Sequence, residues 1–123
     1  MSPKKILVVD DEVDLVEMVR FPLEMEGFSV LKSYNREDAL NQTRKEKPDL
    51  ILLDLMLPKL DGYKVCRLLK FDEKYRNIPI LMLTGKALEK DKALGMGTGA
   101  NDYITKPFDL EKLVEKVKAY LSK

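Results

Sequence analysis

A chain of 123 residues is the length of one domain, and 45% hydrophobic residues are enough to build one core. The 22 basic and 21 acidic residues are mixed along the chain and leave a net charge of +1, which argues against nucleic-acid binding by a basic surface. No window holds the roughly 18 apolar residues that a membrane span needs. We therefore expect a single soluble domain over residues 1–123, without membrane contact.

The chain has one cysteine, Cys66, and no histidine. A single cysteine excludes an internal disulfide, so the fold needs no oxidising compartment, and we expect Cys66 to pack on a helix. The opening residues, MSPKKILVVDDE, lack the long apolar core of a signal peptide, which favours a cytoplasmic location. Without histidine, any chemistry has to use carboxylates, Lys, Thr or Tyr.

Five apolar runs of strand length alternate with helical patterns. In chain order they are KKILVVD at 4–10, FSVLKSY at 28–34, DLILLDL at 49–55, IPILMLT at 78–84 and DYIT at 102–105. The first, third and fourth runs are apolar almost throughout, which is typical of parallel strands covered on both faces. The alternation predicts one α/β domain, a doubly wound parallel sheet of five strand-and-helix units with helices on both faces.

Two of the expected helices have distinctive patterns. After the last strand, Asp109 is placed as an N-cap. An apolar face follows it, made of Leu110, Leu113, Val114, Val117 and Leu121. In the first helix, Pro22 removes the hydrogen bond to the Met18 carbonyl, at a cost of about 3 kcal/mol or a bend. We predict a kink at Pro22, far from the ends of the strands.

Polar residues stand at the ends of four of the five strands. They are Asp10, Asp11 and Glu12 after the first, Asp54 in the third, Thr84 in the fourth, and Lys106 with Pro107 after the fifth. Because reactive groups of open parallel sheets gather beyond the carboxyl ends of the strands, we expect these side chains to converge at one rim. Carboxylates so close repel one another, and Mg²⁺ with oxygen ligands is the remedy that suits them best.

A metal beside Asp54 would also neutralise the oxygens of an incoming phosphoryl group. Lys106 and Thr84 can hold further oxygens of that group. An aspartate in these surroundings is a candidate nucleophile that forms an aspartyl phosphate.

Each of these residues alone also has an ordinary structural interpretation. Two acids before a helix are usually a cap, and Asp54 alone could be a buried acid bonded to backbone. Thr84 alone is typical of a turn, and Lys106 of a solvated surface. Tyr103 by itself predicts a core aromatic with its hydroxyl at the surface. Only the joint spacing favours a site.

Four motifs, VVDDE, LLDLMLPKLDG, LMLTGKA and GANDYITKPF, resemble those of the receiver domain of two-component response regulators. Their order and spacing match that family over essentially the whole chain. The resemblance implies a CheY-like fold of the flavodoxin type, with a five-stranded parallel sheet in the order 2-1-3-4-5. It also implies that Asp54 is the phospho-acceptor.

The other site residues follow from the same resemblance. Asp11, Asp54 and the backbone carbonyl of Met56 match the Mg²⁺ ligands, and Asp10 would act mainly through a metal-bound water. Lys106 matches the lysine that contacts the phosphoryl group, and the Lys106-Pro107 peptide matches one that is cis in the family. Thr84 and Tyr103 match the switch pair, in which the hydroxyl moves toward the phosphate and the ring turns inward.

The resemblance implies a phosphorylation switch rather than an enzyme that turns over an outside substrate. The phosphoryl donor would be a sensor histidine kinase or a phosphotransfer protein, since this chain supplies no histidine. The receiver would then bind a downstream target protein or output domain, as a monomer or a phosphorylation-dependent dimer. The sequence names neither the kinase, the target nor the pathway, and it leaves open a stand-alone regulator or a piece of a longer one.

Two departures from the family pattern carry further expectations. Gly95 and Gly97 fall where the fourth helix usually ends, so that helix is either loosened or ends a turn early. Met56 and Lys86 lie two residues after the acceptor and after Thr84, and neither is suited to orient an attacking water. We therefore expect a fairly persistent phosphoryl group.

Several other functions fit the sequence less well. Phosphatases of the haloacid dehalogenase type need a second Asp two residues after the nucleophile, where this chain has Met56. A flavodoxin-like cofactor binder needs a phosphate-cradling loop, whereas VVDDE offers repulsive carboxylates. The GK of TGKA lacks the upstream glycine of a P-loop. A degenerate receiver that binds partners without phosphorylation stays open.

Overall fold

The computed structural model describes residues 3–54, 62–85, 100–106 and 108–122. The elements in chain order are β1 (Lys5–Val9), α1 (Val13–Met25), β2 (Ser29–Ser33), α2 (Arg36–Glu46), β3 (Leu50–Asp54), α3 (Gly62–Lys70), β4 (Ile80–Gly85), β5 (Asp102–Lys106) and α5 (Leu110–Leu121). All five predicted strands are confirmed. The helix expected between β4 and β5, with Gly95 and Gly97, lies outside the described residues.

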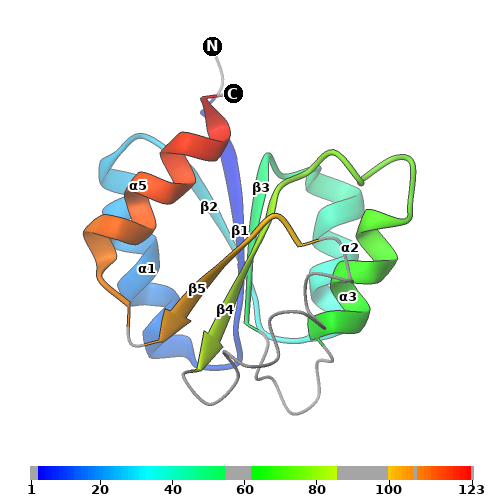
Figure 1. The fold of residues 1–123 in the computed structure, drawn as a ribbon, viewed down its shortest axis with the longest axis horizontal. Helices are drawn as coiled ribbons and strands as arrows, with labels where there is room; N and C mark the ends of the chain where they lie inside the picture. The colour runs from blue at the N-terminus through cyan, green and yellow to red at the C-terminus, as the bar shows by residue number, and fades with distance from the viewer. Residues whose placement is uncertain (1–2, 55–61, 86–99, 107, 123) are drawn as a thin grey trace.

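The five strands form one parallel sheet in the order β2-β1-β3-β4-β5 (Figure 1). This confirms the order that the family resemblance implied. The central strand, β3, has at most 1% of Leu50, Ile51, Leu52 or Leu53 exposed, as expected for a strand covered on both faces. Because every strand runs in the same direction, all five carboxyl ends lie at one edge of the sheet.

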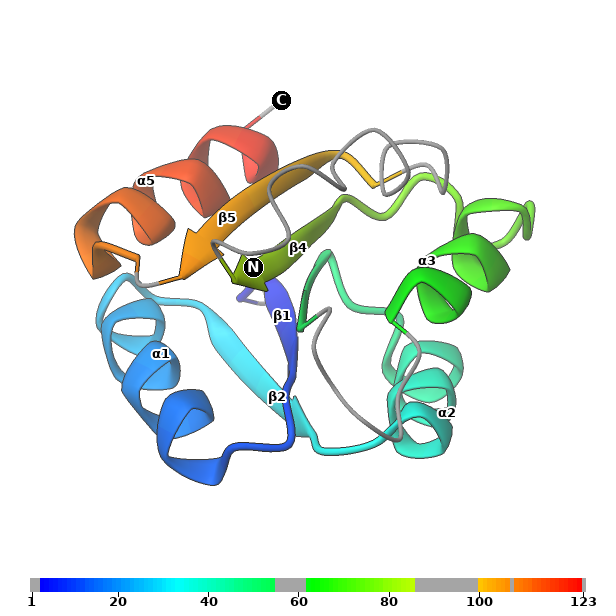
Figure 2. The same ribbon diagram turned by 60° about the horizontal axis from the view of Figure 1, so that its bottom comes forward.

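Helices cover both faces of the sheet, as predicted. Figure 2 shows α1 and α5 on one face and α2 and α3 on the other. The alternation of side chains along each strand divides the core accordingly. Ile6 and Val8 of β1 pack with α1 and α5, whereas Leu7 and Val9 pack with the cluster that contains α2 and α3 residues.

The start of α5 and the position of the cysteine match the sequence-based predictions. The Asp109 side chain accepts a hydrogen bond from the Glu111 N–H at 2.8 Å, which confirms it as the N-cap of α5. At the start of α2, Asn35 accepts one from the Asp38 N–H at 2.8 Å. Cys66 is fully buried on α3, in the packing role expected of it.

The first helix continues past its proline. α1 extends from Val13 to Met25 with Pro22 inside it, so the helix is not broken there, and the kink stays a prediction. It ends shortly afterwards, where Gly27 adopts a φ of +92° that favours glycine. This turn leads the chain back into β2, at the edge of the sheet opposite the polar residues.

Candidate functional site

The predicted site residues stand at the carboxyl edge of the sheet. Asp10 follows the last residue of β1, and Asp54 is the last residue of β3. β4 ends with Thr84 and Gly85, and β5 ends with Lys106, which is opposite Gly85. The parallel topology therefore brings together the four strand ends that the sequence singled out.

The two buried acids lie on neighbouring strands. Leu53 is paired with Val9, so Asp54 and Asp10 occupy the next position on each strand. The Asp10 N–H still donates to the Ser33 carbonyl at 3.1 Å, so the chain runs on alongside β2. Asp10 is 0% exposed and Asp54 is 2% exposed. Side chains two residues apart on a strand point to the same face. Asp10 is two residues after Val8, and Asp54 is two residues after Leu52, so both acids lie on the face that α1 and α5 cover.

Three carboxylates form a tight cluster at the start of α1. One carboxylate oxygen from each of Asp10, Asp11 and Glu12 lies within 4.8 Å of those of the other two. Asp10 also accepts a hydrogen bond from the Glu12 N–H at 2.9 Å, whereas Asp11 and Glu12 are exposed. Oxygen donors at this spacing fit the preference of Mg²⁺. The predicted set of Mg²⁺ ligands does not include Glu12. Its place directly after Asp11 in the sequence is the feature that could have indicated it.

Asp54 is not a member of that three-acid cluster in the described part of the chain. It lies beside the cluster through its strand neighbour Asp10. Met56, the third expected ligand, falls in residues 55–61 and so outside the described residues. The ligand set of Asp11, Asp54 and Met56, with Asp10 behind a water, therefore stays a prediction.

The predicted switch pair, Thr84 and Tyr103, lies on adjacent strands. Tyr103 of β5 is paired with Met82 of β4, and Thr84 lies two residues further along the same strand. The Tyr103 ring packs against the core cluster between the sheet, α2 and α3, and its hydroxyl oxygen is buried. The ordinary interpretation of Tyr103 alone predicted a hydroxyl at the surface. In this structure the ring points inward and the hydroxyl oxygen is buried instead.

For the remaining predicted residues the structure describes less. Thr84 and Lys106 are described by their strand positions. The predicted cis peptide involves Pro107, which lies outside the described residues, as does Lys86. Their roles stay predictions.

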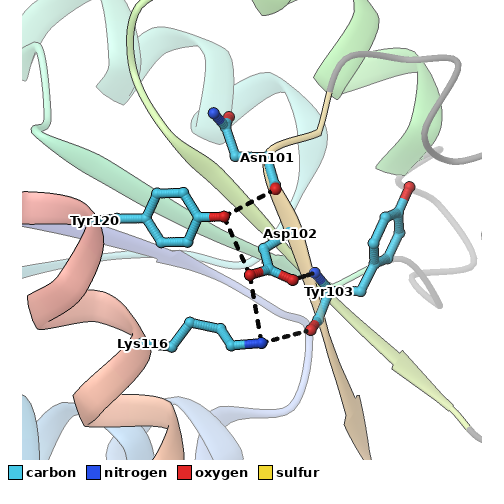
Figure 3. A network of polar contacts seen from close by, with 5 residues as sticks. All are labelled: Asn101, Asp102, Tyr103, Lys116 and Tyr120. Atoms are coloured by element: carbon cyan, nitrogen blue, oxygen red, sulfur yellow. Dashed lines mark hydrogen bonds and ion pairs between the residues drawn. The ribbon is translucent and has the colours of Figure 1, made fainter.

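A network of polar contacts joins α5 to the start of β5 (Figure 3). The Lys116 ammonium is 3.4 Å from Asp102 Oδ2 and donates to the Tyr103 carbonyl at 3.4 Å. The Tyr120 hydroxyl is 3.0 Å from the Asn101 carbonyl and 3.1 Å from Asp102 Oδ2. This network was not predicted from the sequence, although Lys116 and Tyr120 are four residues apart and so share one face of α5.

The side chains of Tyr120 and Lys70 have shifted pKa values. Burial, followed by the hydrogen bond and the charge of Asp102, raises the pKa of Tyr120. Burial lowers the pKa of Lys70, partly offset by Cys66. The Lys70 ammonium donates to the carbonyls of Arg76 and Ile78 at 3.1 and 2.6 Å, and so ties α3 to the segment before β4. Both groups stabilise connections between elements and lie outside the acidic cluster.

This protein has a parallel sheet with acidic residues at its carboxyl edge, and a threonine and a tyrosine on adjacent strands. These features together are typical of response regulator receivers. Residues 6–118 match the family model of the response regulator receiver domain. The chain belongs to that family. In the residues that the structure describes, no helix has the length and hydropathy needed to cross a bilayer.

Similarity to individual proteins agrees with the family match. The chain is 50% identical over 118 residues to the alkaline phosphatase synthesis transcriptional regulatory protein PhoP of Bacillus subtilis (strain 168), covering 96% of this chain and 48% of PhoP. It therefore spans about half the length of this relative.

Solved structures show the same fold. A putative response regulator from Chloroflexus aurantiacus J-10-fl has 37% identity and a TM-score of 0.92, over 98% of this chain and 99% of that one. The chemotaxis response regulator CheY4 of Vibrio cholerae has 29% identity and a TM-score of 0.89, over 97% and 99%. The CheY-like fold of the flavodoxin type is thereby confirmed.

Proposed function

We propose that this receiver accepts a phosphoryl group on Asp54 from a phosphohistidine of a partner histidine kinase or phosphotransfer protein. The observation that carries the proposal is the buried Asp54 at the end of the central strand, beside Asp10 and the acidic cluster. These 123 residues contain no histidine, so the phosphohistidine donor lies outside them.

The proposed transfer is a nucleophilic substitution at phosphorus. One Asp54 carboxylate oxygen forms a bond to phosphorus, and the bond from phosphorus to the donor imidazole nitrogen breaks. The electron pair of that bond stays on the donor nitrogen. Lys106, at the end of β5, would hold one phosphoryl oxygen, and the Thr84 hydroxyl would donate to another.

The acidic edge would hold Mg²⁺ through oxygen ligands. Asp11, Asp54 and the Met56 carbonyl are the proposed direct ligands, with Asp10 acting through a water and Glu12 available close by. When bound, the cation supplies charge neutralisation to the phosphoryl oxygens. The donor set fits, because its clustered oxygens repel one another without a cation.

Phosphorylation would act on the Thr84 and Tyr103 face. As the Thr84 hydroxyl turns toward the phosphoryl group, the Tyr103 ring, which already points inward in this structure, would stay packed behind it. The altered face would then bind a downstream target protein or an output domain, in the cytoplasm. In this proposal the chain assists its own phosphoryl transfer and acts as a switch rather than as an enzyme with an outside substrate.

Intact mass tests the proposal. Incubating the protein with Mg²⁺ and acetyl phosphate should add the mass of one phosphoryl group, and Asp54→Asn should abolish the addition. Asp72→Asn is the matched control, because Asp72 lies beyond the end of α3, where its side chain accepts the Lys74 N–H at 2.9 Å, and should leave it unchanged. An Asp54→Asn variant that gains the same mass contradicts the proposal. A wild type that gains none favours an interaction module that works without phosphorylation.

A further inference from the structure

A buried serine at the end of β2 holds the backbone of Asp10. Ser33 is the last residue of β2 and is fully buried. Its carbonyl accepts the Asp10 N–H at 3.1 Å, directly after Val9 and Ser33, the last paired residues of the two strands. The end of β2 therefore contacts the residue whose carboxylate belongs to the acidic cluster.

The side chain of Ser33 is anchored on α2. Leu31, two residues earlier on β2, packs with the core cluster that contains α2 and α3 residues, so the Ser33 side chain points to that face. Its hydroxyl donates to Asp38 Oδ2 at 2.7 Å and lies 3.4 Å from the Asn35 carbonyl. A hydroxyl has one proton to donate, and the nearer, charged acceptor forms the stronger bond. The end of β2 is thereby tied to the first turn of α2.

Asp38 is itself held in place. It is half-buried, and its backbone N–H donates at 2.8 Å to the side chain of Asn35, the N-cap of α2. A carboxylate in the first turn of a helix is also favoured by the helix dipole. β2 is an edge strand of the described sheet, so one side of its backbone faces no neighbouring strand there. Asp38 gives the end of this edge strand a second point of attachment.

We propose that Ser33 and Asp38 are positioning residues for the divalent cation, because their hydrogen bond fixes the strand end that holds the Asp10 backbone. The inference rests on the proposed function, in which the acidic cluster holds Mg²⁺. Asp10 also accepts the Glu12 N–H at 2.9 Å, so a displaced Asp10 displaces the start of α1 with it. The bond between Ser33 and Asp38 therefore sets the spacing of the carboxylates before a cation arrives, and binding has less ordering to supply.

Calorimetric titration of the full chain with Mg²⁺, without a phosphoryl donor, tests this positioning. Ser33→Ala and Asp38→Ala should each raise the Kd for Mg²⁺ by about threefold to tenfold, less than the loss of a partner bonded directly to a metal ligand. The double variant should bind as weakly as either single variant, because both changes remove the same bond. Urea denaturation without Mg²⁺ measures the stability of each variant separately.

The control variants separate the hydrogen bond from the charge. Glu37→Ala removes an exposed acid next to Asp38 in the first turn of α2, whose side chain has no hydrogen bond to Ser33. It should bind Mg²⁺ as the wild type does. Asp38→Asn keeps an acceptor oxygen for Ser33, so it should bind Mg²⁺ more tightly than Asp38→Ala. Hydrogen exchange of the Asp10 amide without cation should be faster in Ser33→Ala and unchanged in Glu37→Ala.

The outcomes distinguish the positioning role from the metal assignment beneath it. If Ser33→Ala lowers stability but binds Mg²⁺ as the wild type does, the role of Ser33 is only structural and the inference is overturned. An equal loss of affinity in Glu37→Ala also overturns it, since charge alone would then explain the effect. A loss in Asp11→Asn without one in Ser33→Ala or Asp38→Ala leaves the metal assignment intact and removes the positioning role. If the wild type binds no Mg²⁺, both fail.

Discussion

Hydrogen bonds of single side chains hold the strand ends and loops of this receiver in position. Asp10 is a fully buried carboxylate that accepts the Glu12 N–H, and Lys70 donates to two carbonyls before β4. A buried polar group without a partner would cost about 1–3 kcal/mol, so the bond of buried Asp10 matters more than exposed ion pairs, such as that of Arg20 with Glu24, worth about 0.2–1 kcal/mol. The Tyr120 hydroxyl is less buried, and its hydrogen bonds join α5 to β5.

Tyr120→Phe should lower the free energy of unfolding by about 1 kcal/mol at neutral pH, since it removes the contacts with Asn101 and Asp102. Burial and Asp102 raise the pKa of Tyr120 above its usual 10.0. As the pH rises from 10.0 through the raised pKa of the folded state, the unfolded chain loses the phenol proton first. The stabilisation by Tyr120 is therefore lost over this range. Urea denaturation of both proteins at neutral pH and near pH 10.5 measures the difference. A difference that stays constant or grows with pH is the contrary result.

Helices and strands place the side chains that the site needs. α5 begins at a predicted N-cap and turns Lys116 and Tyr120 toward β5, and β3 carries Asp54 from the core to the sheet edge. α1 is the element with an internal conflict, because Pro22 lies inside the helix and leaves the Met18 carbonyl without its usual donor. Packing of Val16, Val19 and Leu23 in the core offsets that cost.

Pro22→Ala should therefore raise the free energy of unfolding, by about 1–3 kcal/mol, because alanine restores the missing N–H and removes the clash. Pro48→Ala is the control, since Pro48 is buried between α2 and β3, outside any helix, and no gain is expected there. Urea denaturation gives both values. If Pro22→Ala brings no gain, α1 already accommodates its proline without strain.

At the scale of the whole molecule, folding places Asp54 beside the acidic cluster. Asp10, Asp11 and Glu12 are adjacent in sequence, but the fold adds Asp54 from a strand more than forty residues away as the neighbour of Asp10. Repulsion among these carboxylates opposes the folded state, so a cation that binds there stabilises it by mass action.

Addition of Mg²⁺ should raise the thermal midpoint of unfolding, and a chelator should reverse the effect. The gain is roughly 2.7 kcal/mol when the free cation is at a hundred times its Kd. Asp11→Asn should weaken this dependence, whereas Asp14→Asn, an exposed acid in the first turn of α1 outside the cluster, should keep it. Thermal scans over a Mg²⁺ series provide the measurement. A midpoint that does not respond to Mg²⁺ contradicts the metal assignment.

The sequence by itself determined the strands, the described helices and the class of fold. Runs such as LILLD of β3 are apolar enough to require cover on both faces, and the spacing after Asp109 leaves one apolar face for α5. It also identified Asp54 and Asp10 as candidates, because both stand where an apolar strand ends. These signals are local, so they can be read along the chain without knowledge of its packing.

Only the tertiary structure decided which side chains meet across elements. The inward position of Tyr103 depends on the core between the sheet, α2 and α3. The contacts of Lys116 and Tyr120 with Asp102 require α5 to lie beside the edge of β5. Such contacts join residues distant along the chain, and packing of the whole domain sets their distances.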